Sequence, residues 1–209
     1  MKVENKNILV LAPHTDDGEW GAGGTISKFV EDGYDVFYIA FSTCRQSLPE
    51  GLAPDTLQKE CIEATKTLGV KETRFFDYDV RYFNYRRQEI LEDMVKLNKE
   101  LKPGLVLLPG QYDIHQDHHT IHLEGMRAFK NANLLGYELI WNNIQLRSTF
   151  FCKLNEKHIN KKVESILCYK SQEFRNYHNE SFIKSLATTR GVQVNEKYAE
   201  AFDLIKWTI

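Results

Sequence analysis

The chain has 209 residues, 42% of them hydrophobic and 27% charged, which suits one globular domain with a buried core. Its 27 basic and 29 acidic residues leave a net charge of −2. This balance argues against a nucleic-acid partner and against a polybasic membrane anchor.

The cysteines and the first residues indicate the cellular compartment. Cys44, Cys61, Cys152 and Cys168 are widely spaced and include no C-x-x-C pair, which predicts reduced thiols rather than disulfides or a zinc–thiolate site. Residues 1–14 lack the layout of a signal peptide, and no apolar stretch approaches the ~20 residues of a membrane helix. We therefore expect a soluble, cytoplasmic protein.

The first 130 residues alternate between two patterns, short apolar runs that are typical of buried strands and apolar residues at helical spacing. In chain order they predict a strand at 7–12, a helix at 20–32, a strand at 35–41, a helix at 55–68, a strand at 73–77, a helix at 84–100 and a strand at 105–109. Such alternation predicts a Rossmann-like α/β fold, with a mostly parallel sheet flanked by helices.

The pattern is looser after residue 130. It predicts strands at 137–141 and near 147–152, followed by helices at 156–167, 180–189 and 196–205. No internal repeat, linker or low-complexity segment interrupts the chain. We therefore expect residues 1–209 to form a single domain.

The predicted topology points to one place for a functional site. With strand order 3-2-1-4-5, the first and fourth strands are neighbours, and ligands bind beyond the carboxyl ends of such a pair. The first strand is followed by PHTDDGEWGAGG at 13–24, and the fourth by GQYDIHQDHHT at 110–120. The two segments richest in histidine and aspartate are therefore expected to meet.

Three residues of these segments form a candidate metal site. His14 and Asp17 lie three residues apart on the turn after the first strand, and His118 approaches from the neighbouring loop. Two imidazoles and one carboxylate with an open fourth position are typical of catalytic zinc, which lowers the pKa of water to ~7. We expect one Zn²⁺ per chain, with Fe²⁺ as an alternative.

The remaining residues of the motifs supply candidate catalytic groups. Asp16 stands beside Asp17 and is placed to take a proton from water and later deliver it to the leaving amine. His115 is placed to donate a hydrogen bond to the oxyanion, and Asp117 to orient an imidazole. We therefore take Asp16, His115 and Asp117 as the catalytic residues.

Simpler interpretations exist for each residue. Asp16 or Asp17 alone would be an ordinary helix cap. His118 and His122, four residues apart, could be a metal pair of the H-E-x-x-H kind, but His119 stands where the protease has its glutamate. We expect His119 and His122 to be exposed helix residues. The concentration of histidines favours a metal site, since four of the seven lie within 115–122.

These motifs resemble those of the LmbE-like (PIG-L) zinc-dependent N-deacetylases. His14-Thr15-Asp16-Asp17-Gly18-Glu19 is similar to the family's His-Ala-Asp-Asp-x-Glu, and residues 115–118 (HQDH) to its His-Pro-Asp-His. Residues 60–69 (ECIEATKTLG) and the tail from Tyr169 extend the similarity over nearly the whole chain. The resemblance implies His14, Asp17 and His118 as zinc ligands, Asp16 as general base and His115 as oxyanion partner.

One departure from the family concerns the substrate. Leu57 stands where many members carry an arginine that contacts substrate, and Arg45, Arg81 or Arg190 could replace it. For any one arginine a surface salt bridge is the more usual role. Our substrate-binding candidates are Arg190 and Tyr198, from the family-like tail, and Arg81.

We therefore expect zinc-dependent hydrolysis of an N-acetyl amide, with a small N-acetylated amino sugar or sugar conjugate as substrate. The alternatives are a metal-dependent amidase or esterase acting on a non-sugar substrate, and a non-catalytic sugar-binding homologue. Homo-oligomers are compatible with such a fold, and we expect no nucleic-acid and no membrane partner.

Overall fold

The computed structural model describes residues 5–208; residues 1–4, part of the segment expected to lack a signal peptide, and residue 209 lie outside this range. In chain order the elements are β1 (Asn7–Ala12), α1 (Asp17–Glu31), β2 (Asp35–Ala40), η1 (Arg45–Ser47), α2 (Thr56–Leu68), β3 (Glu72–Phe75), η2 (Phe83–Tyr85), α3 (Arg87–Leu101), β4 (Leu105–Pro109), α4 (Gln116–Ala128), β5 (Asn133–Tyr137), β6 (Phe150–Leu154), α5 (Glu156–Ile166), η3 (Lys170–Gln172), α6 (Glu180–Val192) and β7 (Tyr198–Lys206).

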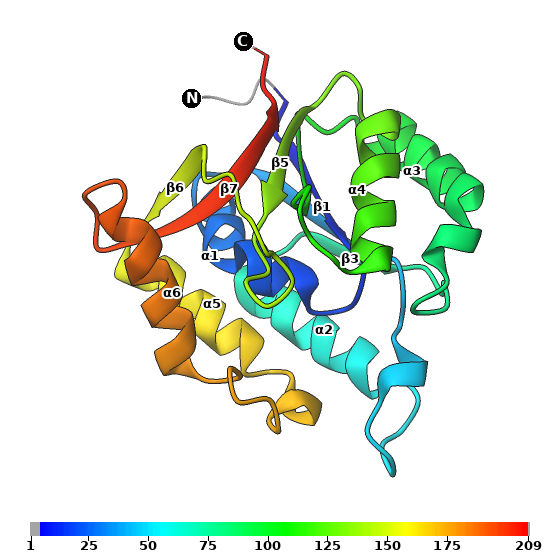
Figure 1. The fold of residues 1–209 in the computed structure, drawn as a ribbon, viewed down its shortest axis with the longest axis horizontal. Helices are drawn as coiled ribbons and strands as arrows, with labels where there is room; N and C mark the ends of the chain where they lie inside the picture. Colours follow the sequence, from blue (N-terminus) through cyan, green and yellow to red (C-terminus); the bar gives the residue numbers. More distant parts are fainter. Residues whose placement is uncertain (1–4, 209) are drawn as a thin grey trace.

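The described strands form one seven-stranded sheet in the order β3-β2-β1-β4-β5-β7-β6 (Figure 1). The first five strands in this order run parallel, and β7 pairs antiparallel with both β5 and β6. The expected order 3-2-1-4-5 and the mostly parallel α/β sheet are confirmed. β1 and β4 are neighbours, so the segments that follow them leave the same edge of the sheet.

Helices cover both faces of the sheet, with α1, α2 and α5 on one face and α3 and α4 on the other (Figure 1). Successive residues of β1 point to opposite faces, so Ile8 and Val10 pack in the first core while Leu9 and Leu11 pack in the second. Because both faces are covered, the central strands read as continuous apolar runs.

The predicted helix at 196–205 is wrong, because these residues form strand β7. Alanine and glutamate in YAEAFDLIK favour a helix in isolation. Pairing with β5 on one side and β6 on the other, together with burial of residues 198–203, overrides that preference. The strand expected at 137–141 lies four residues earlier, at Asn133–Tyr137, where Gly136 packs against the backbone of Gly110.

Helix α1 has a kink at Ala22, where φ is −144° and ψ is 15°. The turn after the kink is capped from β7, because the carboxylate of Glu200 accepts the backbone N–H groups of Gly24 (3.0 Å) and Thr25 (2.7 Å). Lys162 of α5 donates to Glu200 Oε1 (2.6 Å) and to the carbonyl oxygen of Trp20 before the kink (2.7 Å). A buried ion pair therefore satisfies the backbone groups that the kink leaves unpaired.

The glycines around this kink let α1 pack closely on the sheet. A Cβ atom at Gly21 would collide with the ring of Tyr137 on β5, and one at Gly24 would lie 2.5 Å from Leu154 Cδ1 on β6. This close packing holds the first turn of α1, which carries Asp17, against the end of β1.

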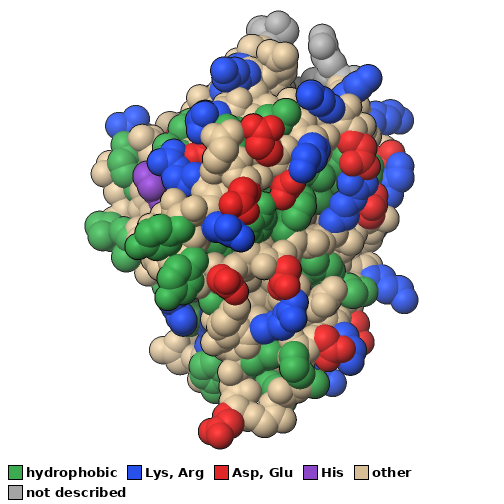
Figure 2. Space-filling view, turned by 90° about the vertical axis from the view of Figure 1, so that its right-hand side faces the viewer, with side chains coloured by type: hydrophobic (Ala, Val, Ile, Leu, Met, Phe, Trp, Pro, Cys, Tyr) green, Lys and Arg blue, Asp and Glu red, His purple; other side chains and the backbone are tan. Residues whose placement is uncertain are grey.

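The surface charges are mixed (Figure 2), and the cysteines form no disulfide among the described residues. On the face shown in Figure 2, basic and acidic side chains are interspersed. Of the four cysteines, none forms a disulfide; Cys168 is half-buried and the others are buried. Within residues 5–208, no helix combines the length and the apolar character needed to cross a bilayer.

Candidate active site

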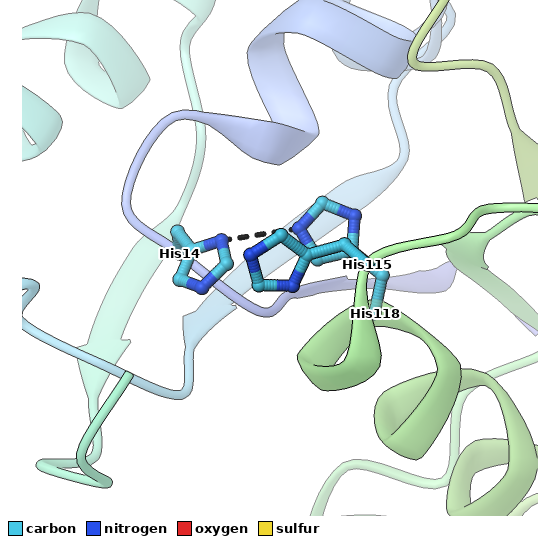
Figure 3. A group of neighbouring side chains, drawn as sticks. All are labelled: His14, His115 and His118. Atoms are coloured by element: carbon cyan, nitrogen blue, oxygen red, sulfur yellow. Dashed lines mark hydrogen bonds between the residues drawn. The ribbon is translucent and has the colours of Figure 1, made fainter. Parts of the chain in front are cut away.

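Two loops at the carboxyl edge of the sheet bring the predicted residues together. The turn after β1 carries His14, Asp16 and Asp17, and the start of α4, which follows β4, carries Asp117 and His118. Figure 3 shows His14 and His118 in contact across the gap between the two loops, with the ring of His115 beside them. This is the meeting of the two motifs that the topology predicted.

Three donor atoms of the expected metal ligands lie close to one another. Asp17 Oδ2 is 3.1 Å from His14 Nδ1 and 3.2 Å from His118 Nε2, and the two nitrogens are 3.1 Å apart. Ligands around a tetrahedral zinc ion with bonds of ~2.0–2.1 Å are separated by about 3.3 Å. The donor set and its spacing therefore fit zinc or a similar divalent ion.

Each of the two imidazoles is oriented by a further carboxylate. His14 Nε2 lies 3.1 Å from Asp117 Oδ2, and His118 Nδ1 lies 2.7 Å from Asp113 Oδ2. Such pairs fix the tautomer and the ring orientation of metal-binding histidines. The sequence analysis did not identify Asp113. The feature that could have indicated it is its position in the same loop, two residues before His115.

The charges around His118 make this position favourable for a cation. Burial lowers the pKa of His118, but the carboxylates of Asp17 and Asp113 outweigh burial and raise it to about 10. The surroundings of His118 therefore favour a positive charge at this position.

His115 differs from the other two histidines of Figure 3 in its surroundings. All three offer nitrogens within 4.8 Å of one another, so a metal site made of three histidines is a geometric alternative. However, the backbone N–H of Asp117 donates to His115 Nδ1 (3.2 Å), which leaves the proton of the neutral ring on Nε2. Burial and the nearby imidazoles lower the pKa of His115 to about 4, so the ring is a neutral donor at pH 7.

Asp16 occupies the N-cap position of α1, but its side chain caps nothing. The carboxylate is 13% exposed and borders the cleft, and its nearest charged partner of opposite sign is Arg175, at 4.0 Å. Burial and the neighbouring Asp17 raise the pKa of Asp16, while Arg175 opposes the rise. Asp16 therefore caps no backbone N–H group of α1, and its carboxylate borders the cleft beside Asp17.

A buried polar cluster fixes the loop between His14 and Asp16. The hydroxyl groups of Tyr38 and Tyr169 lie 2.9 and 2.7 Å from the carbonyl oxygen of Thr15, and both contact the carboxyl group of Glu19. Burial raises the pKa of Glu19 to about 8, so this carboxyl is largely protonated at neutral pH. Glu19, the last residue of the first motif, therefore holds the loop in place through the buried hydroxyl groups of Tyr38 and Tyr169.

The two motifs line a cleft of about 430 Å³, which includes His14, Asp16, Asp17, His115 and His118. Its wall is completed by side chains from several loops, among them Ser47, Leu57, Val80, Arg81, Trp141, Asn142, Gln172, Arg175 and Tyr177. Trp141 and Tyr177 are stacked, with ring centroids 4.5 Å apart. The cleft is large enough for a sugar-sized ligand.

The three substrate-binding candidates lie in different parts of the structure, and only Arg81 lines the cleft. Arg190 pairs with Glu138 and lines a different cavity, and Tyr198 is buried on β7 beneath Lys197. Arg190 and Tyr198 were chosen because they belong to the family-like tail. Arg190 lies in α6, and the folding of residues 198–206 as β7 carries Tyr198 into the core.

The structure brings Arg175 to the cleft instead, and the sequence analysis did not identify it. Arg175 Nη1 donates to the Tyr177 hydroxyl (2.8 Å), and the guanidinium lies over the Tyr177 ring. The segment is anchored to α2, because Glu60 accepts hydrogen bonds from the backbone and hydroxyl of Ser171 (2.9 and 2.6 Å). Residues 60–69 and the tail from Tyr169, which resemble the family, indicated the two segments that form this anchor. They did not single out Arg175.

The other histidines of α4 do not join the donor set. His119 is exposed, as expected. His122 is buried, contrary to expectation, because its Nδ1 pairs with the carbonyl oxygen of Pro109 at 2.8 Å. That contact turns His122 toward the end of β4, which argues against the His118–His122 metal pair.

Comparison with known sequences identifies the family. Residues 9–129, more than half of the chain, match the PIG-L family, described as GlcNAc-PI de-N-acetylase. The diacetylchitobiose deacetylase of Thermococcus kodakarensis is 32% identical over 138 residues, which cover 62% of this chain and 51% of that protein. The chain therefore spans about half the length of this curated relative.

Comparison with solved structures gives the same fold. The N,N'-diacetylchitobiose deacetylase of Pyrococcus horikoshii superposes with a TM-score of 0.79 at 22% identity, covering 96% of this chain and 84% of that one. GalB, the 4-carboxy-2-hydroxymuconate hydratase of Pseudomonas putida KT2440, also has a TM-score of 0.79, at 20% identity and with 97% of each chain covered. One fold thus serves two reactions, so reaction type has to be argued from site residues. By its sequence match and its fold, the chain belongs to the PIG-L family.

Proposed function

We propose that this protein hydrolyses the N-acetyl amide of an amino sugar or sugar conjugate with one divalent metal ion, zinc in the first place. The observation that carries the proposal is the juxtaposition of Asp16, a carboxylate with no capping bond, with the three converging donors of His14, Asp17 and His118. A base beside a three-donor metal site is the arrangement that hydrolysis of an amide needs.

In this proposal His14, Asp17 and His118 hold the metal ion. When bound, the ion supplies Lewis acidity, which activates water and polarises the acetyl carbonyl group. Asp16 takes the proton of the attacking water and passes it to the departing amine nitrogen. His115 donates its Nε2–H to the oxygen that gains negative charge, and Asp117 keeps His14 in place.

The comparisons support the substrate class. The matching family is described as a de-N-acetylase of a GlcNAc conjugate, and the Thermococcus relative is named a deacetylase of diacetylchitobiose. Both names describe removal of an acetyl group from an N-acetylated sugar. We extend this class to the present chain, whose cleft is bordered by the stacked rings of Trp141 and Tyr177.

Acetate release tests the function directly. The zinc-loaded protein is incubated with N-acetylglucosamine and diacetylchitobiose, and with an O-acetyl sugar that lacks the amide. We expect acetate and a free amine from the N-acetyl sugars. Acetate from the O-acetyl sugar alone would replace the proposal with an esterase, and no acetate from any substrate by a metal-loaded protein would favour a binding protein.

Replacing His115 with alanine is expected to lower kcat about 10²–10³-fold, because one donor to the oxyanion is lost. The variant should retain the metal ion, since His115 lies outside the proposed ligand set. Steady-state kinetics and elemental analysis of the same preparation measure both quantities. A rise in KM with unchanged kcat would contradict the oxyanion role.

We also propose that residues 1–209 act as one domain in a reducing compartment. Strands from both halves of the chain share one sheet, and the cysteines carry free thiols.

A further inference from the structure

The backbone at Arg81 has a conformation that residues other than glycine rarely adopt. Within residues 5–208, four non-glycine residues have a positive φ, namely Cys44, Arg81, Lys102 and Asn195. Arg81 has the largest value, +72°. Its side chain is exposed, whereas Val80 before it and Phe83 two residues after it are buried. The buried residues on either side therefore hold the backbone of Arg81 in place.

The backbone from Arg81 to Phe83 wraps around the carboxylate of Asp117. The N–H of Arg81 donates to Asp117 Oδ2 at 2.6 Å, and the N–H of Phe83 approaches Asp117 Oδ1 at 3.4 Å. Between them Tyr82 has φ −118° and ψ 7°, so a left-handed residue is followed by one close to the right-handed region. Such a pair turns its N–H groups to one side and forms an anion-binding nest. Because Asp117 is fully buried, these N–H groups replace the water that a carboxylate would otherwise bind.

The carboxylate in this nest determines which nitrogen His14 offers to a cation. Asp117 Oδ2 also lies 3.1 Å from His14 Nε2. A carboxylate only accepts hydrogen bonds, so the proton of this contact lies on Nε2 and the lone pair of the neutral ring lies on Nδ1. Nδ1 is the atom that lies 3.1 Å from Asp17 Oδ2 and belongs to the proposed donor set. A displaced Asp117 would leave both the tautomer and the ring of His14 unfixed.

Resting on the proposed function, we propose that Arg81 is a positioning residue that acts through its main chain. Residues 81–83 hold Asp117, and Asp117 holds His14 in the tautomer and orientation that a metal ion requires. The guanidinium takes no part in this, so any side chain that tolerates a positive φ serves at position 81. The loop after β3, which supplies none of the proposed ligands, therefore contributes to the metal affinity of the site.

Substitutions at position 81 separate the backbone from the side chain. Arg81→Val places a β-branched residue at a positive φ and should lower zinc affinity about 10–100-fold, the usual effect of losing a group that orients a metal-binding histidine. Arg81→Gly should bind zinc at least as tightly as the wild type, because glycine adopts a positive φ without strain. Arg81→Ala removes the guanidinium but keeps the Cβ atom, so its zinc affinity should stay within about threefold of the wild type. Competition with a chromogenic chelator measures these dissociation constants.

A double-mutant cycle tests whether Arg81 acts through Asp117. Asp117→Asn presents an N–H group where the nest and His14 need acceptors, and it should also lower zinc affinity about 10–100-fold. Adding Arg81→Val to Asp117→Asn should then lower the affinity by less than about a further threefold, because the two changes break one connection. Losses that multiply would overturn the proposal, as would a weakened site in Arg81→Ala or an unchanged one in Arg81→Val.

Lys102 provides a matched control for backbone strain. It is also a non-glycine residue with a positive φ, +44°, but it ends α3 and precedes β4, at the edge of the sheet opposite the cleft. Lys102→Val should lower the midpoint of thermal unfolding without changing zinc affinity. Equal losses of affinity in Lys102→Val and Arg81→Val would indicate general destabilisation and refute the nest.

Hydrogen exchange of the Arg81 amide tests the nest without metal and without turnover. In chelator-treated wild type this proton should exchange slowly, because it is bonded to a buried carboxylate, and Asp117→Asn should accelerate its exchange at least about tenfold. That result supports the nest even where no acetate is released, and equal exchange rates in the two proteins would refute it. Acetate release together with unchanged zinc affinity in Arg81→Val leaves the proposed function standing and refutes the positioning role.

Discussion

Asp16→Asn is expected to lower kcat about 10²–10⁴-fold, the usual contribution of a general acid–base group, while one metal ion per chain remains bound. Asparagine keeps the size of the side chain but cannot take the proton of water. The variant should leave the metal site intact, since Asp16 makes no hydrogen bond to His14, Asp17 or His118 among the described contacts. Steady-state kinetics beside elemental analysis measures both quantities.

Helix α2 offers a matched control for this variant. Asp55 is also an N-cap aspartate without a capping hydrogen bond, and it lies on the surface beside Lys59 at 2.7 Å. Asp55→Asn should change neither kcat nor metal content, so both variants together separate proton transfer from any effect on helix stability. Full activity in Asp16→Asn would remove Asp16 from the mechanism.

Asp17→Ala and His118→Ala are each expected to lose the bound metal ion and, with it, all measurable acetate release. Each variant removes one of three donors that lie 3.1–3.2 Å apart. In Asp17→Ala the two imidazoles also lose the carboxylate that partly neutralises a cation between them. Elemental analysis after removal of metal with a chelator and incubation with zinc should give about one ion per chain in the wild type only.

Two neighbouring histidines decide between the alternative ligand sets. His119→Ala, an exposed residue next to His118 on α4, should bind metal like the wild type. His115→Ala should also retain the ion if Asp17 is the third ligand, and should lose it if the three histidines of Figure 3 hold it. Stoichiometric zinc in Asp17→Ala would therefore move the assignment to His115.

The position of the site could be predicted from the sequence because it depends on short, local signals. Each motif directly follows a continuous apolar run, and such a run specifies a strand buried on both faces. The order of the parallel strands then places the ends of β1 and β4 side by side without any knowledge of side-chain packing. His14, Asp17 and His118 therefore converge as a consequence of topology.

The features that the sequence did not reveal depend on contacts between distant segments. β7 looked helical because the burial that makes it a strand comes from β5 and β6, which are not visible in its own residues. Arg175 lies beside Asp16 in a segment that Glu60 of α2 holds through Ser171. Asp113 became recognisable only when His118 was seen to face it. A single sequence carries no record of such pairings.

The capping of α1 by β7 has a consequence for the order of events during synthesis. Gly24 and its partner Glu200 are 176 residues apart, so a ribosome adding about 5–20 residues per second needs about 10–35 s to produce both. Throughout that interval the helix that carries Asp17 has emerged without the ion pair that supports its kink. The buried ion pair that supports the kink of α1 can therefore form only after β7 has been translated.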